Sequence, residues 1–87
     1  MHAVVVRVNI NEPETAERAL HEQVVPRVSQ APGFVTGYWT RKDNNGLSMI
    51  IFESEDAANQ AIERMRENVP DAVTLQDAEL REVVAHA

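Results

Sequence analysis

The stretch APGFVTGYWTRKDNNGLSMIIFE, from Ala31 to Glu53, decides the fold of this chain. It contains two runs rich in β-branched and aromatic residues, Phe34–Arg41 and Leu47–Phe52, which favour strands. The five residues between them end in Asn45-Gly46, and this pair supplies the positive φ angles that tight hairpin turns require. Every aromatic side chain of the protein lies in the two runs. We therefore predict a central β-hairpin that carries most of the bulky packing groups.

The segment Ala3–Ile10 precedes the hairpin and is predicted to be a strand. Its sequence, AVVVRVNI, is dominated by β-branched residues. Because successive strand residues point to opposite faces, one face is wholly apolar, whereas the other combines Val5 with Arg7 and Asn9. The apolar face is expected to lie in the core.

A first helix is predicted between this strand and the hairpin, ending at about Ser29. Asn11 and Glu14 have the spacing of a capping box, and Pro13 lies in the first turn, where a missing N–H costs little. Pro26 lies inside the helical pattern and is expected to kink the last turn or end the regular helix early. The apolar stripe at i, i+4 spacing consists of Ala16, Leu20, Val24 and Val28.

Two further elements are predicted after the hairpin. A second helix, Ala57–Val69, begins behind Ser54, which can accept a hydrogen bond as its N-cap. The segment Val73–Val84 reads as a strand, with a bulge or bend near Asp77 because the Asp-Ala-Glu sequence there is poor in strand formers.

The element order β-α-β-β-α-β across residues 1–87 predicts a single α+β domain of ferredoxin-like topology. Two right-handed crossovers would place both helices on one face of a four-stranded antiparallel sheet. The run Met49–Phe52 is apolar on both faces, so the second face of the sheet would also expose apolar side chains. Since monomers usually avoid a large exposed apolar patch, we predict a homodimer in which two sheets stack.

The composition excludes several classes of function. The 87 residues carry a net charge of −6, with 14 acidic and 8 basic residues, and this balance disfavours binding to nucleic acid. There is no cysteine for a disulfide or a thiolate ligand. No apolar run approaches the length of a membrane span, and the N-terminus lacks the features of a signal peptide, so a cytoplasmic location without membrane association is the default expectation.

The sequence resembles the dimeric α/β-barrel superfamily, and within it the branch of small proteins similar to antibiotic-biosynthesis monooxygenases. The resemblance covers about residues 3–84. It is carried by the βαββαβ pattern, by Pro32-Gly33-Phe34-Val35 and Tyr38-Trp39, and by Phe52-Glu53-Ser54-Glu55-Asp56-Ala57 leading into the second helix. It implies a ferredoxin-like domain that dimerises into a barrel. The superfamily includes cofactor-independent quinone-forming monooxygenases, heme-degrading enzymes and ligand-binding or stress-related proteins.

Aromatic residues are the first candidates for a binding site. Trp39 could form the wall of a pocket for a flat aromatic ligand, or it could simply be a core or interface residue. Tyr38 points away from Trp39, so only one of the two can face a given cavity. Phe34 and Phe52 are further candidates for the lining of such a pocket.

Polar candidates come from the first strand and the histidines. The resemblance suggests a role for Asn9, because heme-degrading relatives use an Asn on this strand; the alternative is that Asn9 only turns the chain. Arg7 lies on the same face and is expected to pair with Glu79 or Glu82, or to cross the dimer interface. Of the three histidines, His21 is the best candidate for a base, because it borders the buried stripe of the first helix.

No metal site or cofactor is expected. The histidines lack the spacing of a metal site, and the second helix has neither the Trp nor the His that heme-degrading relatives use. Two hypotheses remain open. The protein is a cofactor-independent monooxygenase-like enzyme or a binder of a small aromatic ligand, or it is a non-catalytic, stress-related or structural dimer whose interior is filled.

Overall fold

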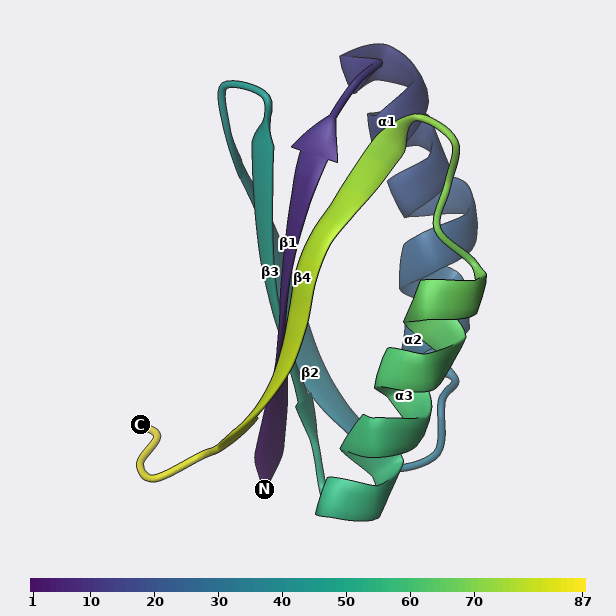
Figure 1. Ribbon diagram of the computed structural model, residues 1–87. Coiled ribbons are helices and arrows are strands. Elements are labelled where there is room, and N and C mark those ends of the chain that lie inside the picture. Colours follow the sequence, from purple (N-terminus) through teal and green to yellow (C-terminus); the bar gives the residue numbers. More distant parts are fainter.

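The computed structural model describes all residues from 1 to 87. A single sheet is covered on one side by all of the helical segments, and both chain termini lie at the same end of the sheet (Figure 1). The elements, in chain order, are β1 (His2–Ile10), α1 (Pro13–Ala19), the π-helical turn η1 (Leu20–Val24), α2 (Val25–Ser29), β2 (Phe34–Lys42), β3 (Asn45–Phe52), α3 (Glu55–Glu67) and β4 (Val73–Glu82).

The sheet has the strand order β2-β3-β1-β4, and all neighbouring strands are antiparallel. This is the predicted ferredoxin-like topology, in which β1 and β3 occupy the centre. The predicted irregularity of the last strand is confirmed, because the register between β1 and β4 shifts so that Gln76 is an extra residue next to Asp77. A second bulge lies in β2, where Val35 has no partner between Phe34 and Thr36.

The bulge in β2 determines which aromatic residue faces the helices. Phe34 is paired with Phe52 on the helix-covered face, whereas Thr36 is paired with Ile51 on the outer face. Without the extra Val35, simple alternation would place Tyr38 on the same side as Phe34. The bulge reverses this parity, so that Trp39 faces the helices.

The hairpin turn differs from the prediction. Lys42 is paired directly with Asn45, so the connection is only two residues long. The positive φ angle belongs to Asp43, at 54°, and Gly46 is a buried residue of β3. Gly46 is required for another reason: a Cβ atom there would lie 2.7 Å from Cγ2 of Val8 on the neighbouring strand.

The predicted capping box at the start of α1 is wrong. The N-cap residue is Glu12, and no side chain caps the helix. Asn11 instead donates from Nδ2 to Oγ1 of Thr74 at 3.0 Å, and the backbone N–H groups of Asn11 and Glu12 both donate to the carbonyl of Ala72. The side-chain amide of Asn11 therefore joins the loop after β1 to the start of β4.

Pro26 perturbs the first helix as predicted, but the disturbance lies before the proline. The N–H of Val25 donates to the carbonyl of Leu20, five residues back, and this forms the π-helical turn. The proline ring would clash with the carbonyl of Glu22 in a regular α-helix, and a wider turn relieves this clash. The helix then continues to Ser29.

The hydrophobic core lies between α3 and the sheet. Val4, Ile50 and Phe52 are completely buried, and α3 contributes Ala58, Ala61 and Ile62. The predicted N-cap of α3 is confirmed, because Oγ of Ser54 accepts a hydrogen bond from the N–H of Ala57 at 3.1 Å. None of the helices is both long enough and apolar enough to span a membrane.

The first helical segment, formed by α1, η1 and α2, packs differently from α3. It contains no buried residue. Its predicted apolar stripe faces the sheet but is only half-buried. The sheet is therefore densely covered by one helix and loosely covered by the other.

Candidate functional site

A pocket of about 520 Å³ lies between the sheet and the first helical segment. Hydrophobic residues make up 14 of the 23 residues that line it. This volume and composition are typical of small-molecule sites, which are concave and mostly apolar with a few polar groups. The pocket is the space between the sheet and α1 and η1, which do not pack closely against the sheet.

The sheet forms the floor of the pocket. Trp39, Ser48 and Val6 lie side by side across β2, β3 and β1, because Ser48 is paired with both of the other residues. Ile50 and Val8 extend this apolar surface on either side. Trp39 also packs against the buried core cluster, so its position is supported from one side and open to the pocket on the other.

The first helical segment forms the roof. All four residues of the predicted apolar stripe line the pocket: Ala16, Leu20, Val24 and Val28. The π-helical turn contributes His21 as well, and the end of α3 closes one side with Met65 and Asn68. Single turns of π-helix occur frequently at functional sites.

Three charged or titratable side chains line the pocket: Glu17, His21 and Arg41. Oε1 of Glu17 lies 3.9 Å from Nε2 of His21, one helical turn apart, and both side chains are largely exposed. Arg41 lies on β2, and its side chain makes no ion pair and no hydrogen bond within the chain. The site therefore combines an apolar body with a polar mouth.

The structure separates the residues that the sequence suggested for a site. Trp39 and His21 line the pocket. Tyr38 projects from the opposite face of the sheet, as do Arg7 and Asn9, because they occupy the other parity of β2 and β1. These three residues therefore do not line the pocket.

Phe34 and Phe52 also lie away from the pocket lining. Their rings form an edge-to-face pair with centroids 6.3 Å apart and an interplanar angle of 77°. Such a pair stabilises a core beyond the area that it buries. Their position under the start of α3 makes them packing residues in this structure.

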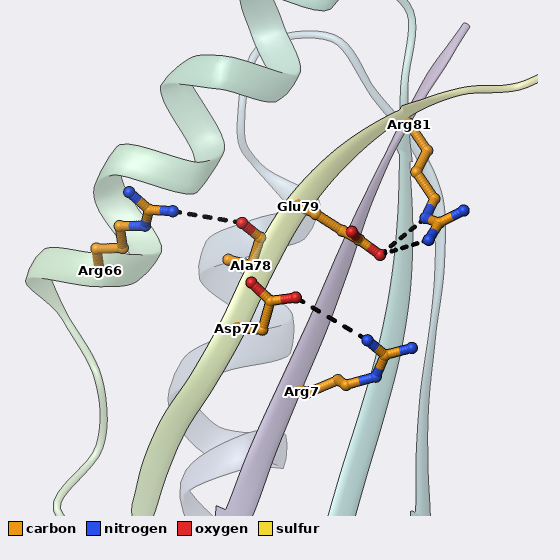
Figure 2. A network of polar contacts seen from close by, with 6 residues as sticks. All are labelled: Arg7, Arg66, Asp77, Ala78, Glu79 and Arg81. Atoms are coloured by element: carbon orange, nitrogen blue, oxygen red, sulfur yellow. Dashed lines mark hydrogen bonds and ion pairs between the residues drawn. The ribbon is translucent and has the colours of Figure 1, made fainter.

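Arg7 pairs with Asp77 rather than with Glu79 or Glu82. Nη1 of Arg7 lies 3.9 Å from Oδ2 of Asp77, directly across the β1–β4 pairing, whereas Glu79 is bound by Arg81 at 2.7 Å (Figure 2). The extra residue Gln76 places Asp77 opposite Arg7. Arg66 of α3 reaches the same strand from the helix side and donates to the carbonyl of Ala78 at 3.3 Å (Figure 2).

The outer face of the sheet is apolar along β2 and β3 and charged along β4. Tyr38, Leu47 and Met49 are exposed there, next to the half-buried Ile51. The prediction that the second face of the sheet carries apolar side chains is therefore confirmed. The charged half is the row of ion pairs drawn in Figure 2.

Sequence reasoning missed five polar residues of the pocket: Glu17, Thr40, Arg41, Ser48 and Asn68. The signal for two of them was present. Arg41 is two residues after Trp39 and so shares its face of the strand, and Glu17 is one helical turn before His21. No group of three or more His, Cys, Asp or Glu side chains is arranged to hold a metal ion.

Comparison of the sequence with protein-family models and with characterised proteins finds no match. Solved structures do match. A dimeric ferredoxin-like protein from an uncultured marine organism superposes with a TM-score of 0.69 at 11% identity, covering 100% of this chain and 98% of that one. The heme degrader MhuD from Mycobacterium tuberculosis, solved with two hemes in its active site, superposes with a TM-score of 0.52 at 22% identity, covering 97% of this chain and 98% of that one. This chain thus has the ferredoxin-like fold that these proteins share.

Proposed function

We propose that the protein is a homodimer that binds a small, flat, mostly apolar molecule in the pocket between its sheet and its first helical segment. The observation that carries this proposal is the pocket of about 520 Å³, with Trp39 on its floor. A planar ligand would lie on the indole ring and on the aliphatic surface of the central strands, where stacking and burial both contribute.

The pocket argues against the alternative of a structural module with a filled interior. Protein interiors are packed as densely as organic crystals, and voids larger than a few waters are uncommon. The helix α3 packs tightly on the sheet through its alanines, whereas no residue of the first helical segment is buried. A ligand in this space would bury more of the half-buried Leu20 and Val24.

The dimer follows from the outer face of the sheet. Tyr38, Leu47 and Met49 together form an exposed apolar surface on β2 and β3. A two-fold partner would cover this surface with its own copy of the same residues. The description of one structural neighbour as a dimeric ferredoxin-like protein supports the same assembly.

A second candidate function is favoured by the pairing of Glu17 with His21 on the pocket wall. In a cofactor-independent monooxygenase, a base removes a proton from a phenol-like substrate, and the resulting anion reacts with O₂. One oxygen atom enters the quinone product and the other leaves as water. In this second proposal, His21 acts as that base, and its position on the pocket lining next to Glu17 supports the assignment.

The pocket residues do not fit a heme. Heme iron is usually held by a buried His, Cys, Tyr or Met side chain. The one histidine of the lining, His21, has a side chain that is 71% exposed and adjacent to Glu17. From α3, the lining contains Met65, but Met holds heme iron together with a His, and α3 supplies no imidazole. We therefore assign no step to heme.

Binding can be tested with N-phenyl-1-naphthylamine, an uncharged flat probe. Trp39 is the only tryptophan of the chain, so quenching of its emission during a titration reports binding at the pocket floor. Ser48→Leu should place a branched side chain into the pocket beside Trp39 and weaken the affinity at least about tenfold, since the leucine displaces the ligand from the apolar surface.

The matched control is Gln60→Leu, which adds the same side chain to the exposed face of α3. This variant should bind the probe as the wild type does. Thermal unfolding followed by circular dichroism checks that both variants are folded. An unchanged affinity of a folded Ser48→Leu variant, or a wild type that binds no flat apolar probe, would refute the proposed binding site.

A further inference from the structure

Arg41 is the one permanent cation on the wall of the pocket. It lies two residues after Trp39 on β2, so both side chains project from the same face of the sheet. Its guanidinium forms no ion pair, although the chain has 14 acidic residues and a net charge of −6. An arginine without a carboxylate partner beside an apolar pocket is free to bind a group that enters with a ligand.

The neighbouring strand leaves Arg41 accessible from within the pocket. Arg41 is paired with Gly46, and Gly46 is paired with Val8 on β1. Gly46 places no side chain between the arginine and the apolar floor, and the side chains of Val8 and Ile10 fill the space over it. Arg41 is exposed and lines the pocket together with Val8, so a ligand that rests on Val8 and Trp39 lies next to the strand that carries the guanidinium.

The other arginines near the sheet are already engaged. Arg7 contacts Asp77, Arg81 contacts Glu79, and Arg66 donates to a backbone carbonyl of β4. The opposing charge on the pocket wall is Glu17, which lies on the helical roof and contacts His21. The positive side of the pocket is therefore the strand side, at Arg41.

We propose that the natural ligand is a flat apolar molecule with one acidic group, such as a carboxylate, a sulfonate or an ionised phenol, and that Arg41 holds this group. This inference rests on the proposed function, because it names the ligand class of the same pocket. The planar guanidinium presents paired N–H donors that match the two oxygens of a carboxylate. The apolar body lies against Trp39 and Val8, while the acid lies at the pocket mouth.

The test uses two fluorescent probes with the same anilinonaphthalene body. The probe 8-anilinonaphthalene-1-sulfonate carries an acidic group, and N-phenyl-1-naphthylamine does not. The Kd of each is measured by quenching of Trp39 emission in the wild type, in Arg41→Gln and in Arg27→Gln. Arg27 is an exposed residue of α2 that does not line the pocket, so its substitution removes the same charge elsewhere.

Arg41→Gln should weaken binding of the sulfonate at least about tenfold, as expected for the loss of a hydrogen-bonded ion pair, and leave the uncharged probe within about twofold. Arg27→Gln should change neither Kd by more than about twofold, because an exposed charge outside the site is screened by salt. The unchanged affinity for the uncharged probe also shows that the Arg41 variant is folded.

Two results would overturn the inference while leaving the pocket intact. One is that Arg41→Gln still prefers the sulfonate probe to the uncharged probe as the wild type does. The other is that Arg41→Gln and Arg27→Gln lose the same affinity for the sulfonate, which would show that only the overall charge of the protein affects binding. A wild type that binds neither probe would instead refute the proposed function together with this inference.

Discussion

The substitution Met49→Lys should dissociate the proposed dimer. Met49 lies in the middle of the outer face of β3, paired with Tyr38 and Val5 on the adjacent strands. Its side chain is part of the exposed apolar surface, and nothing in the protomer requires an apolar residue at a position that is 48% exposed. The substitution should therefore leave the fold of one protomer intact and act on association alone.

The expected loss of dimer stability follows from the exposed fraction of the Met49 side chain. Complete burial of a Met side chain stabilises by roughly 1.5–3 kcal/mol, so burying the exposed half contributes about 1 kcal/mol. A two-fold interface contains each residue twice, so the dimer loses about 2 kcal/mol when both copies of Met49 are replaced. This corresponds to a rise in the dimer Kd of at least about 30-fold, and burying two ammonium groups raises it further.

The assay is sedimentation velocity over a concentration series, with the dimer Kd as the readout. The wild type should have a mass near twice the 9.7 kDa of one chain, and Met49→Lys should shift toward the monomer. Gln60→Lys makes the same change of charge on the exposed face of α3 and should leave the Kd unchanged. A wild type that sediments as a monomer at micromolar concentration would refute the dimer, and an unaltered Kd of Met49→Lys would show that this face is not the interface.

Two further substitutions test the pocket. Gly37→Ala should lower the affinity for N-phenyl-1-naphthylamine several-fold, because the new Cβ would lie 3.0 Å from Cη2 of Trp39 and push the indole ring toward the pocket. The control is Thr36→Ala, on the outer face of the same strand. Equal affinities of the two variants would contradict this position of the ring. His21→Gln should keep the affinity for the probe but abolish any oxygen consumption with a polycyclic phenol, measured with an oxygen electrode, because the amide cannot act as a base. Unchanged turnover in His21→Gln would remove His21 from the proposed chemistry, and a wild type without turnover would leave binding as the function.

Local signals in the sequence predicted the elements and their order correctly. Ser54 was identified as an N-cap because its position before an acidic, apolar-periodic segment is sufficient to specify a helix start. Asn11 had the same kind of signal and does not cap, because its amide bonds to Thr74, 63 residues away in sequence. A local capping motif competes with hydrogen bonds to residues far away in the sequence. The sequence alone does not show which of the two hydrogen bonds forms.

The turn of the hairpin illustrates the same limit. Asn45-Gly46 is a strong local signal for a turn, yet Gly46 is needed in β3, where Val8 of β1 approaches too closely for a side chain. The shorter turn follows from the register of β1 against β3, which no local pattern specifies. The acid expected for Arg7 is also wrong, because Glu79 is held by Arg81 and the register of β1 against β4 places Asp77 opposite Arg7.

Alternation along β2 requires that Tyr38 and Trp39 of the Ala31–Glu53 stretch face opposite ways, and this much the sequence determines by itself. The tertiary structure decides which of them faces the helices, because the bulge at Val35 inverts the parity that begins at Phe34. The apolar stripe of the first helix was also evident from its period. Whether that stripe fills the core or forms the roof of a pocket depends on the distance between the helix and the sheet, which is set by packing between residues far apart in the chain.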